Sequence, residues 1–159
     1  MSVLAAGNAA KQFNKMIVLQ AGSILEASLS QIIYRAQNFN LEGVPNISEG
    51  DRSEIAGKKV DKFSSTIDVL QKYHVLDGIN AGIYRELHKL RRYRNKIHIQ
   101  DDMNIDNVRR DEDQVFSLNL TSWAMELNLR VLRHLSEKYP RPQHANDYVE
   151  SICVPTGFP

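Results

Sequence analysis

Apolar side chains recur every three or four residues along most of this chain, and that spacing is typical of helices that bury one face. The clearest series lies in the first forty residues. It consists of Val18, Gly22, Leu25, Leu29, Ile32, Ala36 and Phe39, widened by Ile17, Ala21, Ile24 and Ile33. No stretch alternates apolar and polar residues over a length that would favour a β-strand. The sequence therefore predicts an all-α bundle of four main helices.

Turn-forming residues set the expected ends of these helices. Asp51 and Glu54 have the spacing of a capping box, so the second helix is expected to begin at Asp51. Gly57 is a point at which this helix could divide in two, which would add a short helix. The acidic residues at 111–113 suit the start of the last helix, because they complement its macrodipole. The expected helices cover about 9–40, 51–77, 80–98 and 111–139.

The core of the predicted bundle comes from the apolar faces of the later helices as well as the first. These faces consist of Val60, Phe63, Ile67 and Leu70; Ile83, Leu87, Leu90 and Ile97; and Phe116, Leu120, Trp123, Leu127, Val131 and Leu135. A chain of 159 residues with 42% apolar residues suits one globular domain. Pro140 and Pro142 end the last helix, so we expect a bundle over 1–140 and an irregular C-terminal tail over 141–159.

Composition excludes several classes of protein. The single cysteine, Cys153, rules out an intrachain disulfide framework and a multi-cysteine zinc site. Polar residues interrupt the longest apolar stretch, Met16–Leu29, before it reaches the length of a membrane span. Glycine-rich phosphate loops, serine nucleophile elbows and zinc-protease motifs are absent from the sequence. We therefore expect a cytoplasmic protein without a membrane segment, metal or cofactor.

Charge is distributed unevenly although the chain carries a formal net charge of only +1. Six basic residues and one acidic residue lie between Tyr84 and Gln100, which gives a local charge of +5. The following stretch, Asp101–Asp113, has six acidic and two basic residues, a local charge of −4. Such runs are most often solvated helix faces, but a basic helix is also typical of a surface that binds phosphate.

Arg94 stands at a position where the apolar series Ile83, Leu87, Leu90 requires an apolar side chain. An unpaired guanidinium at such a site loses hydration at a cost of several kcal/mol, so Arg94 must meet a carboxylate, reach past the bundle end or face an anion. At 100° per residue, His98 lies only about 40° away from Arg94 on the helix. An arginine beside a histidine that titrates near neutrality can hold a phosphate and move a proton.

The segment Leu87–His98 resembles the signature helix of HEPN-domain proteins (higher eukaryotes and prokaryotes nucleotide-binding), and Ala21–Leu29 is similar to the opening helix of that family. The resemblance implies an all-α bundle that forms a homodimer and binds RNA. It also implies a metal-independent endoribonuclease of a toxin or defence system, because many family members have that activity. The family motif is an arginine, usually followed by a polar residue, and then a histidine after four to six residues.

The resemblance implies that His98 is the motif histidine and leaves its arginine open. Arg94 is followed by Asn95 but stands only three residues before His98, whereas Arg92 and Arg91 have five and six intervening residues. We favour Arg94. The candidate catalytic pair is therefore His98 and Arg94, with Glu26 as a supporting residue. The candidate substrate-binding residues are Asn95, Arg91, Arg92, Lys96 and Tyr93.

Two other interpretations stay open. In the second interpretation, the chain is a non-catalytic binding or dimerisation module for a nucleotide or a protein, and Arg94 is paired with Glu26 or a loop aspartate. In the third interpretation it is a regulatory subunit whose acidic stretch, Asp101–Asp113, recognises a protein partner. We expect the other histidines to be surface or packing residues: His74, His88, His134 and His144.

Overall fold

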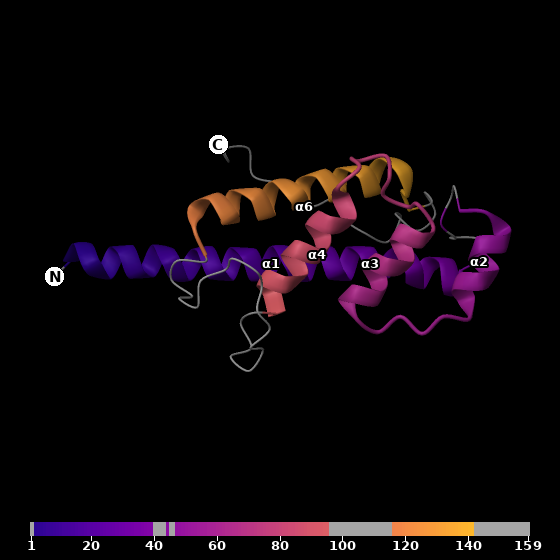
Figure 1. The fold of residues 1–159 in the computed structure, drawn as a ribbon, viewed down its shortest axis with the longest axis horizontal. Helices are drawn as coiled ribbons and strands as arrows, with labels where there is room; N and C mark the ends of the chain where they lie inside the picture. Colours follow the sequence, from indigo (N-terminus) through magenta and orange to yellow (C-terminus); the bar gives the residue numbers. More distant parts are fainter. Residues whose placement is uncertain (1, 40–43, 45–46, 96–115, 142–159) are drawn as a thin grey trace.

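The computed structural model describes residues 2–39, 44, 47–95 and 116–141, with side chains from Phe13 onward. Within this part of the chain it contains five α-helices and no strand, so the all-α prediction is confirmed (Figure 1). The helices are α1 (Ser2–Asn38), α2 (Glu49–Ala56), α3 (Phe63–Lys72), α4 (Ile83–Asn95) and α6 (Leu118–Lys138).

The long helix α1 is the element on which the others are arranged. Figure 1 shows α6 running alongside α1 in the same direction, with α4 crossing it steeply and α2 near its C-terminal end. Two contacts fix the parallel register of α1 and α6. Asn128 donates a hydrogen bond from Nδ2 to the carbonyl of Ala21 at 2.8 Å, and Arg35 donates to the carbonyls of Tyr139 and Pro140 at 3.0 and 3.1 Å.

Most of the predicted core is confirmed. Leu25, Leu29, Ile67, Leu87 and Leu127 are fully buried, as are other apolar residues predicted for the same faces. Three residues assigned to the apolar stripe of the first helix are instead exposed: Ile17, Ile24 and Phe39 are 37%, 40% and 38% accessible. Their prediction was wrong because a stripe that wide exceeds the face that α4, α3 and α6 can cover. Trp123, another predicted core residue, is half-buried at the edge of the bundle.

The helix boundaries differ from the predicted ones at several ends. Helix α1 begins at Ser2 rather than near Ala9, and α4 begins at Ile83 rather than Asn80. The capping residue of α2 is Ser48, whose hydroxyl accepts a hydrogen bond from the Asp51 amide, so the helix begins before the capping box that we predicted. The predicted second helix is divided after Gly57 into α2 and α3. Helix α6 begins at Leu118, capped by Ser117, and not at Asp111.

Helix α3 ends at Lys72 rather than at Asp77 because the chain turns sharply there. His74 has a φ of 55°, a left-handed conformation that stops a helix. Its Nδ1 lies 2.8 Å from a carboxylate oxygen of Asp77, which stabilises the turn. The chain then passes through residues 75–82 to the start of α4.

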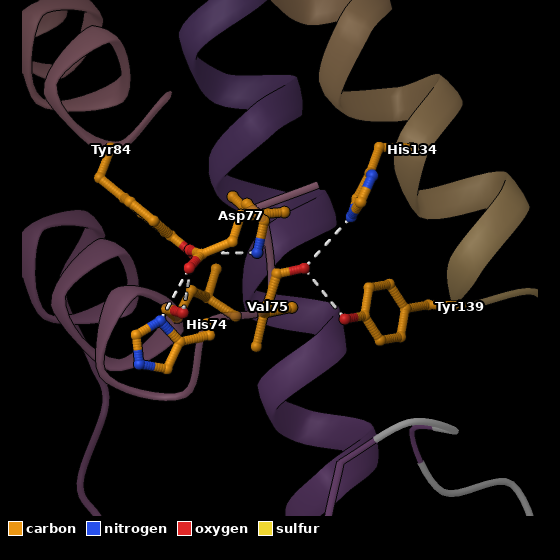
Figure 2. A network of polar contacts seen from close by, with 8 residues as sticks. His74, Val75, Asp77, Tyr84, His134 and Tyr139 are labelled. Carbon is orange, nitrogen blue, oxygen red and sulfur yellow. Dashed lines mark hydrogen bonds and ion pairs between the residues drawn. The ribbon is translucent and has the colours of Figure 1, made fainter. Parts of the chain in front are cut away.

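A buried polar network holds this turn between α4 and α6 (Figure 2). The hydroxyl of Tyr84 donates to Asp77 at 2.7 Å and accepts from the amide of Leu76 at 2.9 Å. The carbonyl of Val75 accepts a hydrogen bond from the hydroxyl of Tyr139 at 2.9 Å, and it lies 3.2 Å from Nε2 of His134. Burial, together with Asp77, raises the pKa of Tyr84, so its hydroxyl keeps its proton and acts as a donor. The network thereby fixes where α4 begins.

The segment Phe13–Asn38 of α1 is long and apolar enough, by length and composition, to cross a membrane. A core helix of a water-soluble bundle passes the same test, and Val18, Leu25 and Leu29 of this segment are completely buried by the other helices. The segment is therefore weak evidence for a membrane span. The predicted tail over 141–159 lies outside the described residues, apart from Arg141.

Candidate functional site: the basic helix and its ion pair with the first helix

Arg94 lies in the last turn of α4 and reaches toward α1. Its Nη1 is 2.5 Å from Oε2 of Glu26, and both side chains are little more than a quarter exposed, at 28% and 29%. The guanidinium carbon also lies 5.9 Å from the ring centroid of Phe63, within the range of a cation–π contact. The expectation that a cation in an apolar series must find an anion is thus met by a carboxylate of the first helix.

Gly22 allows this approach. A β-carbon added at Gly22 would lie 3.2 Å from Cδ and 3.4 Å from Cβ of Arg94, closer than an ordinary contact. Glu26 stands four residues after Gly22, hence on a neighbouring part of the same helix surface. The glycine leaves room for the stem of Arg94, and the glutamate receives its guanidinium. Together they form one docking position for α4 on α1.

The other predicted binding residues do not gather around Arg94. Arg92 is exposed and points about 160° away from Arg94, as expected for two residues two positions apart on a helix. Asn95 and Arg91 are half-buried, and Nε of Arg91 has no hydrogen-bond partner among the described residues. Tyr93 packs edge-on against Trp123, with 6.4 Å between ring centroids. His98 and Lys96 lie outside the described residues.

An ion pair and a cation–π contact join α4 to α6. Arg130 of α6 donates from Nη2 to Oε2 of Glu86 at 2.6 Å. Burial alone would raise the pKa of Glu86, but the hydrogen bond and charge of Arg130 outweigh it and lower that pKa. Lys89 remains exposed, with its ammonium 4.6 Å from the ring centroid of Trp123. Thus the only acidic residue of α4 is used to bind α6, and the helix keeps a strong excess of positive charge.

Sequence reasoning also missed the polar partner of His88. His88 places Nε2 at 3.2 Å from Oδ1 of Asp68 in α3, so the histidine is not simply a surface or packing residue. Burial lowers the pKa of His88, while Asp68 acts in the opposite direction. In the sequence, the only indication of this contact was the apolar periodicity of α3 and α4, which predicts that the two helices pack face to face. Among the described residues, no group of three or more His, Cys, Asp or Glu side chains could hold a metal ion.

A scan against protein-family models gave no match, and neither the curated proteins nor the solved structures that were searched contain a match to this chain.

The Arg94–Glu26 contact is expected to stabilise the fold measurably. In a double-mutant cycle of Arg94→Ala and Glu26→Ala, followed by chemical denaturation, we expect a coupling free energy of about 1–2 kcal/mol, between the values for exposed and buried pairs. The exposed pair Lys59–Asp61, 3.6 Å apart, is the matched control and should couple by about 0–0.5 kcal/mol. A coupling for Arg94 and Glu26 no larger than that of the control would show that the contact does not hold α4.

Proposed function

We propose that this protein binds RNA through α4 and cleaves it without a metal ion. The observation that carries the proposal is the density of positive charge on α4: five basic residues and one acidic residue within thirteen positions. Arg85, Lys89 and Arg92 are exposed, so the phosphate backbone of RNA can reach them. Contacts of this kind contribute most of the affinity in nucleic-acid binding and are independent of base sequence.

The proposed chemistry uses His98 and Arg94. His98 removes the proton from a ribose 2′-hydroxyl, whose oxygen attacks the adjacent phosphorus and expels the 5′-oxygen. The expelled oxygen takes up a proton, and the products are a 2′,3′-cyclic phosphate and a 5′-hydroxyl. Arg94 offsets the charge that builds up on the phosphate oxygens. Glu26 orients the guanidinium of Arg94 through Nη1, which is the role of a positioning residue.

We further propose a homodimer of the toxin or defence ribonuclease class, as the HEPN resemblance implies, and a cytoplasmic location, as the composition favours. What supports a second copy here is an apolar surface on α1 and α6. Ala21 receives a hydrogen bond from Asn128, which brings the sides of the two helices together. The neighbouring apolar residues are exposed to solvent: Ile17, Ile24, Leu118, Met125 and Leu129. A second copy would remove this surface from water.

A non-catalytic module for a nucleotide or a protein partner is the second candidate, and the Arg94–Glu26 contact favours it. A guanidinium bound to a carboxylate at 2.5 Å already has a structural partner, so the position of Arg94 is explained without a substrate. In that case Arg94 contributes to stability and the chain has no ribonuclease activity.

RNA binding is expected to depend on salt and on Lys89. For a single-stranded RNA, replacing one phosphate-binding cation reduces the slope of log K against log salt concentration by about 0.7. We expect this change for Lys89→Gln, measured by fluorescence anisotropy over a series of salt concentrations. Lys59→Gln is the control, because Lys59 is exposed in the segment between α2 and α3. Equal slopes for both variants and the wild type would contradict binding through α4.

Cleavage is expected to persist in EDTA and to need His98. Incubation of the purified protein with mixed RNA should yield 2′,3′-cyclic phosphate ends, and His98→Ala should lower the rate by about 10²–10⁴-fold, the usual contribution of a general base. His144→Ala is the control. Glu26→Gln should slow cleavage less than Arg94→Ala does. Wild-type protein that binds RNA without producing cyclic ends would support the non-catalytic module instead.

The proposed dimer is expected to depend on Leu129, which is 63% exposed. Leu129→Lys places a charge in the apolar surface of α1 and α6, and it should shift the protein from dimer to monomer in analytical ultracentrifugation without unfolding it. Ser53→Lys on the exposed surface of α2 should leave the dimer intact. A wild-type protein that sediments as a monomer at micromolar concentration would contradict the proposed dimer.

A further inference from the structure

A shallow, solvent-open cavity of about 430 Å³ lies on the side of α4 that faces away from Arg94. Its wall comes from the end of α3, the start of α4 and one face of α4. The lining residues are Gln71, Ala81, Gly82, Tyr84, Arg85, His88 and Arg92. Cavities of this size hold small organic ligands rather than a single ion.

Arginines and a histidine converge on this cavity. Arg85, His88 and Arg92 stand three and four residues apart, which places all three on one face of α4. On a helix, Arg85 is about 180° and Arg92 about 160° from Arg94, so the cavity is separate from the contact with Glu26. Two guanidinium forks on one wall match the paired oxygens of a phosphate group.

The acidic groups near the cavity leave this positive charge largely in place. Asp68 is bound to Nε2 of His88, and its side chain is 65% exposed. Glu86 of the same helix is taken up by Arg130 and by Nδ2 of Asn80. The paired Asp68 fixes the histidine ring without facing either arginine in any described contact. Asp77 is bound to Tyr84 and His74 in the same way, so each nearby carboxylate has another partner and none has a described contact with Arg85 or Arg92.

The remaining wall is suited to the uncharged part of a ligand. The hydroxyl of Tyr84 is bound to Asp77 (Figure 2), to the carbonyl of Leu70 and to the amide of Leu76. Tyr84 is 9% exposed, so it contributes a small apolar part of the pocket wall rather than a free hydroxyl. Ala81 and Gly82 add little side-chain volume to this wall, and a β-carbon added at Gly82 would lie 3.5 Å from Nη2 of Arg85. The amide of Gln71 adds one neutral hydrogen-bonding group.

We propose that this cavity binds a phosphate ester, with its phosphate held by Arg85 and Arg92 and its uncharged part against Tyr84 and Ala81. The site shares Arg85 and Arg92 with the proposed RNA-binding surface, and so deepens that proposal, but it involves neither Arg94 nor His98 and needs no cleavage. The phosphate ester is either a free small molecule or a nucleotide within a bound RNA strand. Both sources have the same chemistry, and a competition experiment separates them.

The test is a calorimetric titration of the full chain with AMP, ribose 5-phosphate and adenosine. We expect the two phosphate esters to bind and adenosine to bind at least about tenfold more weakly. Arg85→Gln and Arg92→Gln should each weaken AMP binding by about tenfold or more. Arg133→Gln, an exposed arginine of α6, is the matched control and should bind AMP as the wild type does. Ala81→Leu should also weaken binding, because the larger side chain would occupy part of the cavity without a change in charge.

A second measurement identifies the source of the phosphate. If a saturating single-stranded RNA displaces AMP, the cavity holds a nucleotide of the strand; if AMP remains bound, it holds a free ligand. The Lys89→Gln variant should bind AMP normally even where it weakens RNA binding, which keeps this test independent of the proposed function. The proposal is overturned if neither phosphate ester binds at millimolar concentration, if adenosine binds as tightly as AMP, or if both arginine variants bind like the wild type.

Discussion

The C-terminal end of α4 is held on α1 by the ion pair between Arg94 and Glu26 above Gly22. A guanidinium so close to the core loses part of its hydration, and the carboxylate of α1 offsets that loss. The glycine lets the arginine stem pass, so that charge pairing and close helix packing occur at the same point. Since the other end of α4 is held by Tyr84 and the turn before it, the helix is fixed at both ends. These two contacts determine which faces of α4 remain exposed.

This arrangement divides the cations of α4 by role. Arg94 pairs with Glu26 of α1, and Glu86 pairs with Arg130 of α6. One positive and one negative charge of α4 are therefore bound to other helices. The cations that remain exposed, including Lys89 and Arg92, lie on the other faces. Such a charge excess is common on solvated helix faces, and it is also what a phosphate-binding surface requires. The binding and structural interpretations of the sequence are therefore compatible, since the exposed cations can contact phosphates while Arg94 holds the helix and, in the proposed reaction, also faces the phosphate.

The sequence predicts the helices and most of the core because apolar periodicity is a local property that burial enforces directly. It also anticipates that Arg94 needs an anion and names Glu26 as one choice. It does not predict the contact of His88 with Asp68, or the burial of Arg35 against the carbonyls at the end of α6, because both join residues that are distant in the chain. The width of the first stripe was overestimated for a similar reason. Whether Ile17 and Ile24 are covered depends on how many helices pack around α1, and the pattern within α1 carries no information on that number.

The central claim is that α4 is the surface that contacts RNA. The most direct measurement is photo-cross-linking of a 4-thiouridine-labelled RNA to the full chain, with the cross-linked peptides identified by mass spectrometry. The account predicts cross-links in peptides that contain residues of α4, with the peptide of α2 unlabelled. Cross-links concentrated on α2 or on the outward face of α1, with α4 unlabelled, would contradict it.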